Sequence, residues 1–162
     1  MLSEIKNMQW VYTKRPSLEV TSENYTLQET TINPNNLHTG EVVIKSLFFS
    51  VDPYMRIQQS AKNSWEAPHP INEVQSGAVV GEVIAVGNNT GDIQLGDKAL
   101  TYTGWQQYAK CHISELKKLP SNSPSLSYAL GVLGMPGRTA YFGLLEAGKP
   151  RPGNTLVVSG CA

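Results

Sequence analysis

Residues 77–87 read Gly77-Ala78-Val79-Val80-Gly81-Glu82-Val83-Ile84-Ala85-Val86-Gly87. Their small and β-branched side chains show no helical period, which predicts one long strand from Gly77 to Val86. The glycines at 77, 81 and 87 indicate points where a sheet bends or where a neighbouring backbone comes close. This segment is therefore expected to lie within a β-sheet.

Further strand patterns lie on both sides of this segment. They cover residues 9–13, 25–32, 41–51, 99–102 and 105–113. The chain has 14 glycines and 10 prolines, which supply turns between these runs, as at Asn33-Pro34. Many short strands separated by turns are typical of a small antiparallel barrel or sandwich.

The pattern changes to a helical one near residue 125. Apolar residues from 126 to 133 predict a first helix, which Gly134-Met135-Pro136-Gly137 interrupts. A second helix is predicted from about Arg138 to Glu146, because its apolar side chains recur at i, i+3 and i+4. Gly148 has the residue type that favours a helix C-cap.

Residues 155–159, Thr-Leu-Val-Val-Ser, are apolar on both faces. Such a strand usually lies inside a parallel sheet that is covered on both sides. One interpretation is that it joins the earlier sheet. We favour a second interpretation, in which it is the first strand of a dinucleotide-binding domain. The order of helix, Pro152-Gly153 turn, apolar strand and Gly160 is the usual approach to that fold.

Composition excludes several classes of function. The 162 residues carry 13 basic and 13 acidic side chains, so the net charge is zero and the basic surface that binds nucleic acid is not expected. The longest apolar runs, such as Leu156-Val157-Val158, are too short to span a membrane. Met1 to Gln9 lacks the pattern of a signal peptide, and Cys111 and Cys161 are no disulfide framework. We therefore expect a soluble cytoplasmic protein with no nucleic-acid or membrane partner.

The cysteines and histidines do not predict a metal site. The sequence contains neither Cys-x-x-Cys nor His-Glu-x-x-His. Cys111 and His112 are neighbours in a predicted strand, so their side chains should point to opposite faces. Cys111 is expected to be a small buried apolar residue, whereas His38 and His69 are expected to be solvated in loops.

Three segments in this order resemble one enzyme family. They are Ser50-Val51-Asp52-Pro53-Tyr54-Met55-Arg56, Gly134-Met135-Pro136-Gly137-Arg138-Thr139-Ala140-Tyr141 and Thr155-Leu156-Val157-Val158-Ser159-Gly160. They are similar to the zinc-independent medium-chain dehydrogenase/reductases, in the branch of the prostaglandin reductases, leukotriene hydroxydehydrogenases, plant alkenal double-bond reductases and bacterial curcumin reductases. The resemblance implies a mainly β fold with some α. Residues 1–124 would form a GroES-like catalytic domain, and residues 125–162 would carry the interdomain helices and first strand of an incomplete Rossmann cofactor domain.

The resemblance also implies a reaction. Members of this branch use NADP(H) to reduce the carbon–carbon double bond of α,β-unsaturated aldehydes and ketones by hydride transfer. The partner would be a small-molecule enone or enal, and a homodimer is compatible with the family. The glycine-rich turn and the basic residues that grip the 2′-phosphate would follow residue 162, and Cys161 stands where the family usually has Ala or Gly. We therefore expect the 162-residue chain to have no turnover by itself.

The resemblance also implies site residues. Asp52 suits a helix N-cap and Pro53 the first helical position, so a short helix over 53–57 should present Tyr54 and Arg56. Tyr54 is the candidate catalytic residue, because a neutral phenol can donate to the substrate oxygen where negative charge develops. Arg56 would also contact the substrate. Cofactor contacts are expected from Pro53, Met135, Thr139 and Gly160, with no metal.

Each of these assignments has an alternative. Tyr54 could instead pack its helix onto the barrel, and Arg56 more readily forms an ion pair with a nearby acid. The Gly134–Gly137 segment could be a plain kink between packed helices. For the whole chain, the alternatives are a free-standing GroES-like binding or assembly module without enzymatic activity, and an isolated catalytic domain.

Overall fold

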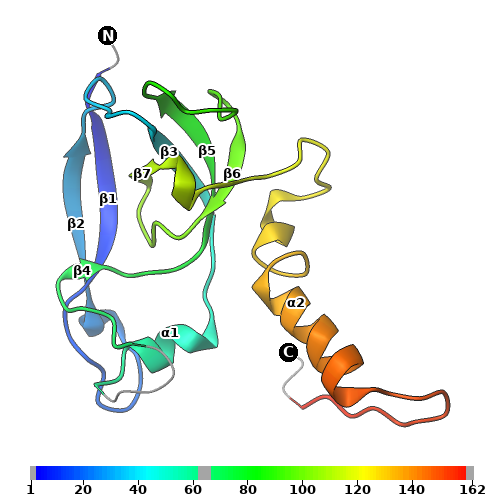
Figure 1. Cartoon of the computed structure of the whole chain (residues 1–162). Helices are drawn as coiled ribbons and strands as arrows, with labels where there is room; N and C mark the ends of the chain where they lie inside the picture. Colours follow the sequence, from blue (N-terminus) through cyan, green and yellow to red (C-terminus); the bar gives the residue numbers. More distant parts are fainter. Residues whose placement is uncertain (1–2, 62–66, 160–162) are drawn as a thin grey trace.

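The strands form two antiparallel sheets, from which a helical arm departs (Figure 1). The computed structural model describes residues 3–61 and 67–159. The smaller sheet has the order β2-β1-β4, formed by Tyr25–Ile32, Ile5–Tyr12 and Glu73–Val74. The larger sheet has the order β7-β3-β5-β6-β8, formed by Tyr108–His112, Glu41–Phe49, Val79–Val86, Lys98–Thr101 and Lys117–Lys118.

Helical elements are few and short. The barrel carries η1 (Ser22–Asn24), α1 (Pro53–Gln58) and η2 (Ile113–Glu115). The arm consists of η3 (Leu126–Ala129), α2 (Met135–Phe142) and η4, a π-helix (Gly143–Gly148). Within the described part of the chain, none of these helices has the length and apolar character needed to cross a membrane.

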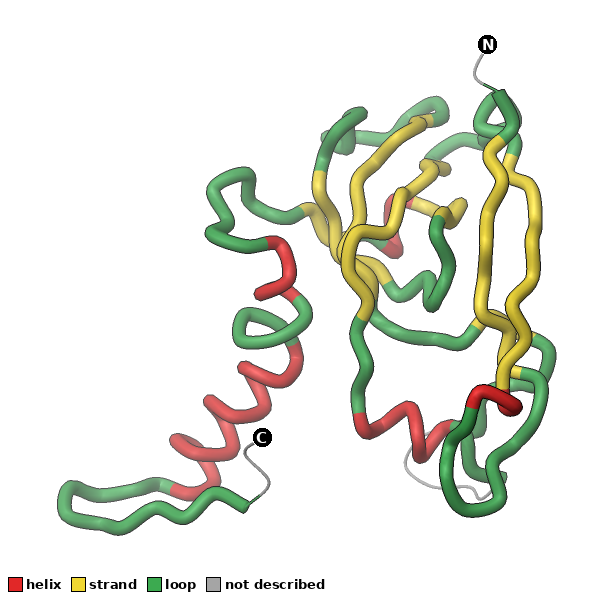
Figure 2. Tube along the Cα trace, turned by 180° about the vertical axis from the view of Figure 1, so that it is seen from behind, coloured by secondary structure: helices red, strands yellow, loops and turns green. Residues whose placement is uncertain are grey.

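Figure 2 shows the two sheets side by side, and the segment before β7 joins them. Gln9 forms a bridge with Gln106, the Trp10 amide donates to the Trp105 carbonyl at 2.9 Å, and the Gln107 amide donates to the Met8 carbonyl at 2.9 Å. The residues of β1 therefore hydrogen-bond to both sheets. This arrangement confirms the predicted small antiparallel β domain.

The core lies between β3, β5, β6 and β7. It comprises Val42, Ile44, Val83, Ile93, Ala99 and Cys111. Burial raises the pKa of the Cys111 thiol to about 12, so the thiol stays protonated and acts as a small apolar side chain. The prediction for Cys111 is confirmed, and its neighbour His112 is exposed on the opposite face.

Gly81 allows β3 and β5 to approach closely. The pairing of these strands changes register between Val43 and Ile44 and again between Ser46 and Phe48. A Cβ atom at position 81 would overlap the Ile44 side chain and would lie 2.6 Å from the Lys45 carbonyl oxygen. The prediction that a backbone approaches this glycine is confirmed.

The strands predicted for the barrel are present, and two additional ones were missed. β2 has the predicted bounds, and the other strands differ from the predicted ranges by a few residues at their ends. β4 and β8 each have two residues, Glu73–Val74 and Lys117–Lys118. Two residues are too few to show the alternation that identifies a strand in a sequence.

The arm departs from the predicted helices. α2 begins at Met135, three residues before the predicted start at Arg138, because Pro136 lies in the first turn, where its missing N–H is not needed. The Gly134–Gly137 segment therefore starts a helix rather than interrupting one. The left-handed residue after η4 is Lys149, with φ of 47°, and not Gly148.

Residues 155–159 form no strand in this structure. Leu156, Val157 and Val158 are 59%, 86% and 60% exposed. A strand is stabilised by hydrogen bonds to a neighbouring strand, and neither described sheet includes this segment. The expectation of a strand here is wrong for this chain, and so is the alternative that the segment joins the earlier sheet.

A buried polar network fixes the end of α1 to the barrel. The Tyr12 hydroxyl donates to the Gln59 carbonyl at 3.0 Å, and the Gln59 amide donates to Gln75 Oε1 at 3.0 Å. Arg15 adds bonds of 3.3 Å to the Gln59 carbonyl and 3.1 Å to the His69 carbonyl. The position of α1 is therefore set by residues from three distant segments.

His69 is buried, which corrects the expectation that it is solvated. Its Nε2 donates to the Val74 carbonyl at 3.0 Å. Burial, the largest influence, lowers the pKa of His69 from its ordinary value of 6.5. His38 is exposed as predicted. No pattern near residue 69 indicates the burial of His69, because it depends on distant contacts. One of them is the bond from the Arg15 side chain, 54 residues away, to the His69 carbonyl.

We expect Gly81→Ala to lower the free energy of unfolding by roughly 1–3 kcal/mol, because the added methyl group would force β3 and β5 apart. Urea unfolding followed by tryptophan fluorescence measures the change. Gly143→Ala is the matched control, because a Cβ atom there meets nothing within 4 Å. Equal stability of G81A and the unchanged chain would contradict the close approach of the two strands.

We expect the free energy of unfolding to fall as the pH is lowered from about 8 to about 5.5. His69 takes up a proton near its ordinary pKa of 6.5 once the chain is unfolded, but resists protonation in the folded state, where its pKa is lowered. Urea midpoints across this range measure the slope. His69→Gln should flatten the slope and His38→Gln should preserve it. A slope that H69Q leaves unchanged would refute this assignment.

Candidate functional site

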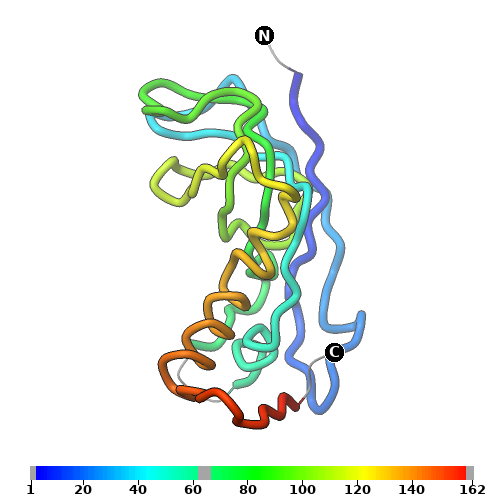
Figure 3. Tube along the Cα trace, turned by 90° about the vertical axis from the view of Figure 1, so that its right-hand side faces the viewer, coloured from blue at the N-terminus to red at the C-terminus, as the bar shows by residue number. Residues whose placement is uncertain are grey.

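A small cavity lies between the barrel and the base of the arm. Its volume is about 20 Å³, enough for one water-sized group. The lining residues come from α1, β5, β6 and the arm, and they are Asp52, Tyr54, Ala78, Leu100, Tyr102, Ala129, Leu130, Met135, Pro136 and Arg138. Figure 3 shows the arm running along the side of the barrel that carries these elements.

The end of β3 fixes the barrel side of this cavity. The Ser50 amide donates to the Ala78 carbonyl at 2.8 Å, and the Ala78 amide donates to Ser50 Oγ at 3.0 Å. The Trp105 indole also donates to the Ser50 carbonyl at 3.1 Å. These bonds join the end of β3 to the start of β5, just before the chain enters α1. They therefore fix the position of Ala78, at the cavity, relative to the helix that carries Tyr54.

The start of α1 follows the sequence prediction. Asp52 occupies the N-cap and Pro53 lies at the first helical position, although the Asp52 side chain makes no capping hydrogen bond. Met55 is 4% exposed and packs beside Gly77. Tyr54 precedes this buried residue and lines the cavity.

Only some of the predicted site residues meet at this cavity. Tyr54 and Met135 line it together, although they are 81 positions apart. Thr139 lies one helical turn beyond Met135 and is exposed, and Pro53 is exposed at the start of α1. Neither of these two lines the cavity. Gly160 lies outside the described residues.

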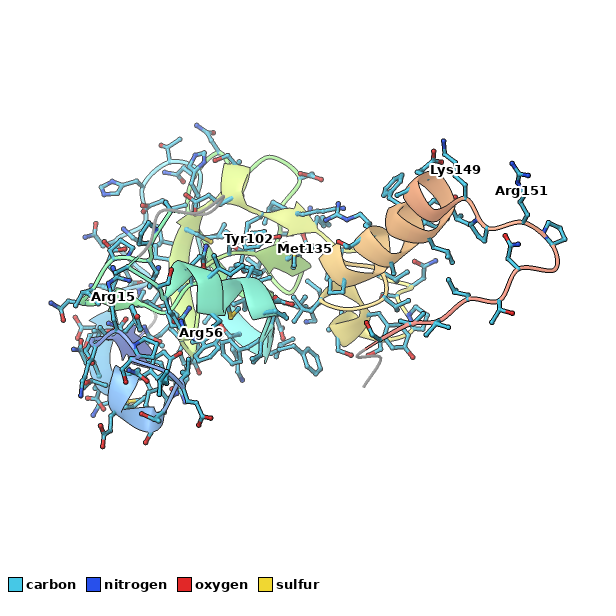
Figure 4. All side chains as sticks on the ribbon, turned by 90° about the horizontal axis from the view of Figure 1, so that it is seen from below. Arg15, Arg56, Tyr102, Met135, Lys149 and Arg151 are labelled. Atoms are coloured by element: carbon cyan, nitrogen blue, oxygen red, sulfur yellow. The ribbon has the colours of Figure 1, made fainter. Side chains whose placement is uncertain are left out.

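Arg56 is held away from the cavity. Its guanidinium donates to the Leu18 carbonyl at 2.9 Å. Figure 4 shows Arg56 on the barrel, well separated from Met135. Among residues 3–61 and 67–159, Arg56 has no acidic partner within 4.0 Å. The expected ion pair is therefore replaced by a bond to a backbone carbonyl.

Sequence reasoning missed Tyr102 as a lining residue. Ala99 and Thr101 are 0% and 1% exposed, so strand alternation places Leu100 on the other face, and Tyr102 lines the cavity just beyond the end of β6. That alternation is visible in the sequence. Which face of the strand meets the arm is not visible, because it depends on the path of residues 120–135.

The glycines at the base of α2 are needed for the backbone conformation of the arm. A Cβ atom at Gly134 would overlap the Ala129 carbonyl, and one at Gly137 would overlap the Val132 carbonyl. These glycines are therefore required by the tight turn before α2. From α2, Met135 (40% exposed), Pro136 and Arg138 line the cavity, and the exposed Thr139 lies on the same helical face as Met135.

The cavity provides neutral hydrogen-bond donors in apolar surroundings. Two tyrosines, Tyr54 and Tyr102, line it together with Ala78, Leu100 and Met135. Asp52 and Arg138 bring opposite charges to its edge without forming an ion pair within 4.0 Å. In the described part of the chain, no three His, Cys, Asp or Glu residues are grouped so as to hold a metal ion. Such a cavity suits a small polar oxygen attached to an apolar molecule.

A larger hollow lies elsewhere on the barrel. Its volume is about 470 Å³, and it is lined by Met8, Trp10, Leu27, Phe49, Val51, Trp105, Gln106 and Gln107. It is larger and more apolar than the cavity at Tyr54, but it contains none of the predicted site residues. We therefore take the smaller cavity, where two separate motifs meet, as the candidate site.

Comparison with known proteins identifies the family. Residues 8–119 match the model for the N-terminal domain of oxidoreductase. The NADPH-dependent curcumin reductase of Escherichia coli is 40% identical over 155 residues, which are 95% of this chain and 44% of the relative. Prostaglandin reductase 1 of Rattus norvegicus is 37% identical over 145 residues, 88% of this chain and 41% of the relative.

The fold is also found in solved structures. A crystal structure of CurA from Vibrio vulnificus in complex with NADPH matches with a TM-score of 0.81 and 40% identity, over 91% of this chain and 42% of that one. The chain thus spans less than half the length of the relatives it matches. Because the family model covers most of the chain and the relatives are reductases of one branch, the chain belongs to the zinc-independent medium-chain dehydrogenase/reductases, to whose N-terminal domain it corresponds.

Proposed function

We propose that this chain forms the substrate-binding half of an NADPH-dependent reductase that reduces the double bond of α,β-unsaturated aldehydes and ketones. The observation that carries the proposal is the meeting of Tyr54 and Met135 at one cavity. The first comes from the Val51–Arg56 motif and the second from the Gly134–Tyr141 motif. The proposal is further supported by relatives that are named as NADPH-dependent curcumin reductase and 2-alkenal reductase.

Tyr54 would act on the carbonyl oxygen of the substrate. Addition of hydride to the far carbon of an enone moves negative charge onto this oxygen. A hydroxyl that already points to that position stabilises the charge as it develops. Tyr54 lines the cavity between the barrel and the arm, which supports it as the donor.

The face of α2 fits the nicotinamide-ribose end of the cofactor. NADPH would supply the hydride when bound. Met135 would offer an apolar surface beside the ring, and Thr139, one turn further, a hydroxyl to the ribose. Pro53 would limit the approach from the α1 side, and Gly160 stays a prediction beyond the described residues. Arg56 is the weakest of the proposed contacts, since its guanidinium already bonds to the Leu18 carbonyl.

The alternative of a free-standing binding module is disfavoured by the arm. A compact monomer of 17.7 kDa has an accessible surface of about 7,900 Å². This chain has 10,551 Å², roughly 2,600 Å² more. Every residue from 138 to 159 is exposed, including Tyr141, Phe142 and Leu145. An excess of this size is in the range of a stable interface, which supports a second lobe as the cover of the arm. A homodimer and a cytoplasmic location stay predictions.

We expect the 162-residue chain to oxidise no NADPH in the presence of an enone. Fused in frame to the remainder of the Escherichia coli curcumin reductase, it should gain this activity, measured as loss of NADPH absorbance. Tyr54→Phe in the fusion should lower kcat roughly 100-fold, because the donor to the developing charge is lost.

Tyr108→Phe, on β7 and away from the cavity, is the matched control and should keep full activity. The proposal fails if a folded fusion that binds NADPH reduces neither an enone nor an enal. Turnover by the isolated chain would also overturn the proposal that this chain is only half of the site. Full activity of the Y54F variant would remove the hydroxyl from the mechanism.

A further inference from the structure

Tyr102 lies at the mouth of the cavity and has no evident structural role. Its side chain is 62% exposed. In the described part of the chain it makes no hydrogen bond and stacks on no other ring. An exposed aromatic ring at the edge of a cavity contributes nothing evident to folding. A role in ligand binding accounts for its position.

The neighbouring strand fixes the position of Tyr102. Thr101 pairs with Val79 and points into the core, where it is 1% exposed. Tyr102 follows the last residue of β6 and lines the cavity together with Leu100. Figure 4 shows Tyr102 beside Met135, between the barrel and the arm. The ring therefore forms a wall of the cavity mouth opposite the arm.

The wall at the mouth matters for binding because the enclosed part of the cavity is small. The enclosed part of the cavity, about 20 Å³, has room for a small group such as a carbonyl oxygen beside Tyr54 and Met135. The rest of the molecule would lie at the mouth, where Leu100 and Tyr102 also line the cavity. A planar group conjugated to the double bond would stack on the Tyr102 ring, which a short aliphatic chain cannot do.

We infer that Tyr102 is a substrate-binding residue that favours enones conjugated to an aromatic ring over enones with a short aliphatic chain. This inference rests on the proposed function and adds to it the residue that selects the substrate. Tyr54 would bind the carbonyl oxygen, whereas Tyr102 binds the group at the other end of the conjugated system and takes no part in hydride transfer.

The test measures binding, so that it is independent of turnover. The complete 162-residue chain is titrated by NMR with benzylideneacetone and with ethylideneacetone, which share the enone and differ in a phenyl against a methyl group. We expect Tyr102→Leu to reduce the preference for benzylideneacetone roughly five-fold, the effect of losing one stacked ring pair. Tyr102→Phe should retain the preference, because it keeps the ring.

Phe48→Leu is the matched control, because Phe48 is a 42% exposed aromatic residue that lines neither the cavity nor the larger hollow. The F48L variant should show the same ligand preference as the unsubstituted chain. The dispersion of the NMR spectra checks that each variant is folded. The inference is overturned if Y102L keeps the preference for benzylideneacetone, or if Y102L weakens the binding of both ligands equally. It is also overturned if the folded chain binds neither ligand. Inactivity of the fused reductase tests the proposed function, whereas the binding preference tests Tyr102, so the two failures are distinguishable.

Discussion

The pairing of β3 with β5 is the interaction on which the rest of this structure depends. It carries the core residues Ile44 and Val83, and its close approach requires a glycine at position 81. The same ladder ends in the two bonds between Ser50 and Ala78. Because α1 begins three residues after Ser50, the strand pairing that stabilises the barrel also determines where Tyr54 lies.

The barrel and the arm differ in how they are stabilised. Strands β5 and β7 bury most of their apolar side chains and β3 buries half of them, whereas the arm from residue 138 to residue 159 buries none. An isolated helix of this length is marginal in water without packing. The candidate site lies between these two parts, with Tyr54 and Tyr102 on the barrel and Met135 on the arm. One wall of the site is therefore rigid, and the other depends on whatever covers the arm.

Much of the barrel could be predicted from the sequence, because its signals are local. A β-branched run that ends before Asn33-Pro34 placed β2 at its observed bounds, and the glycine at 81 indicated the close backbone approach. The Asp52-Pro53 pair located the start of α1. Tyr54 and Met135 were singled out by motif, and they do meet at one cavity.

The features that could not be predicted depend on distant contacts. Burial of His69 follows from packing and from the Arg15 side chain, which no pattern near residue 69 indicates. The segment 155–159 has the composition of a strand, but a strand also needs a neighbour to pair with. Tyr102 follows a predictable strand, yet its position beside Met135 depends on the path of the arm.

The central claim is that the barrel folds by itself while the outer arm depends on a second lobe. Amide hydrogen exchange of the 162-residue chain tests this most directly, because it reports local stability residue by residue. We predict that the amides of Ile44 and Val83 exchange only on global unfolding. Those of Tyr141 and Leu145 should exchange almost as fast as in an unstructured peptide, and should slow once the remainder of a relative is fused to the chain. Arm amides protected as strongly as Ile44 in the isolated chain would contradict the account.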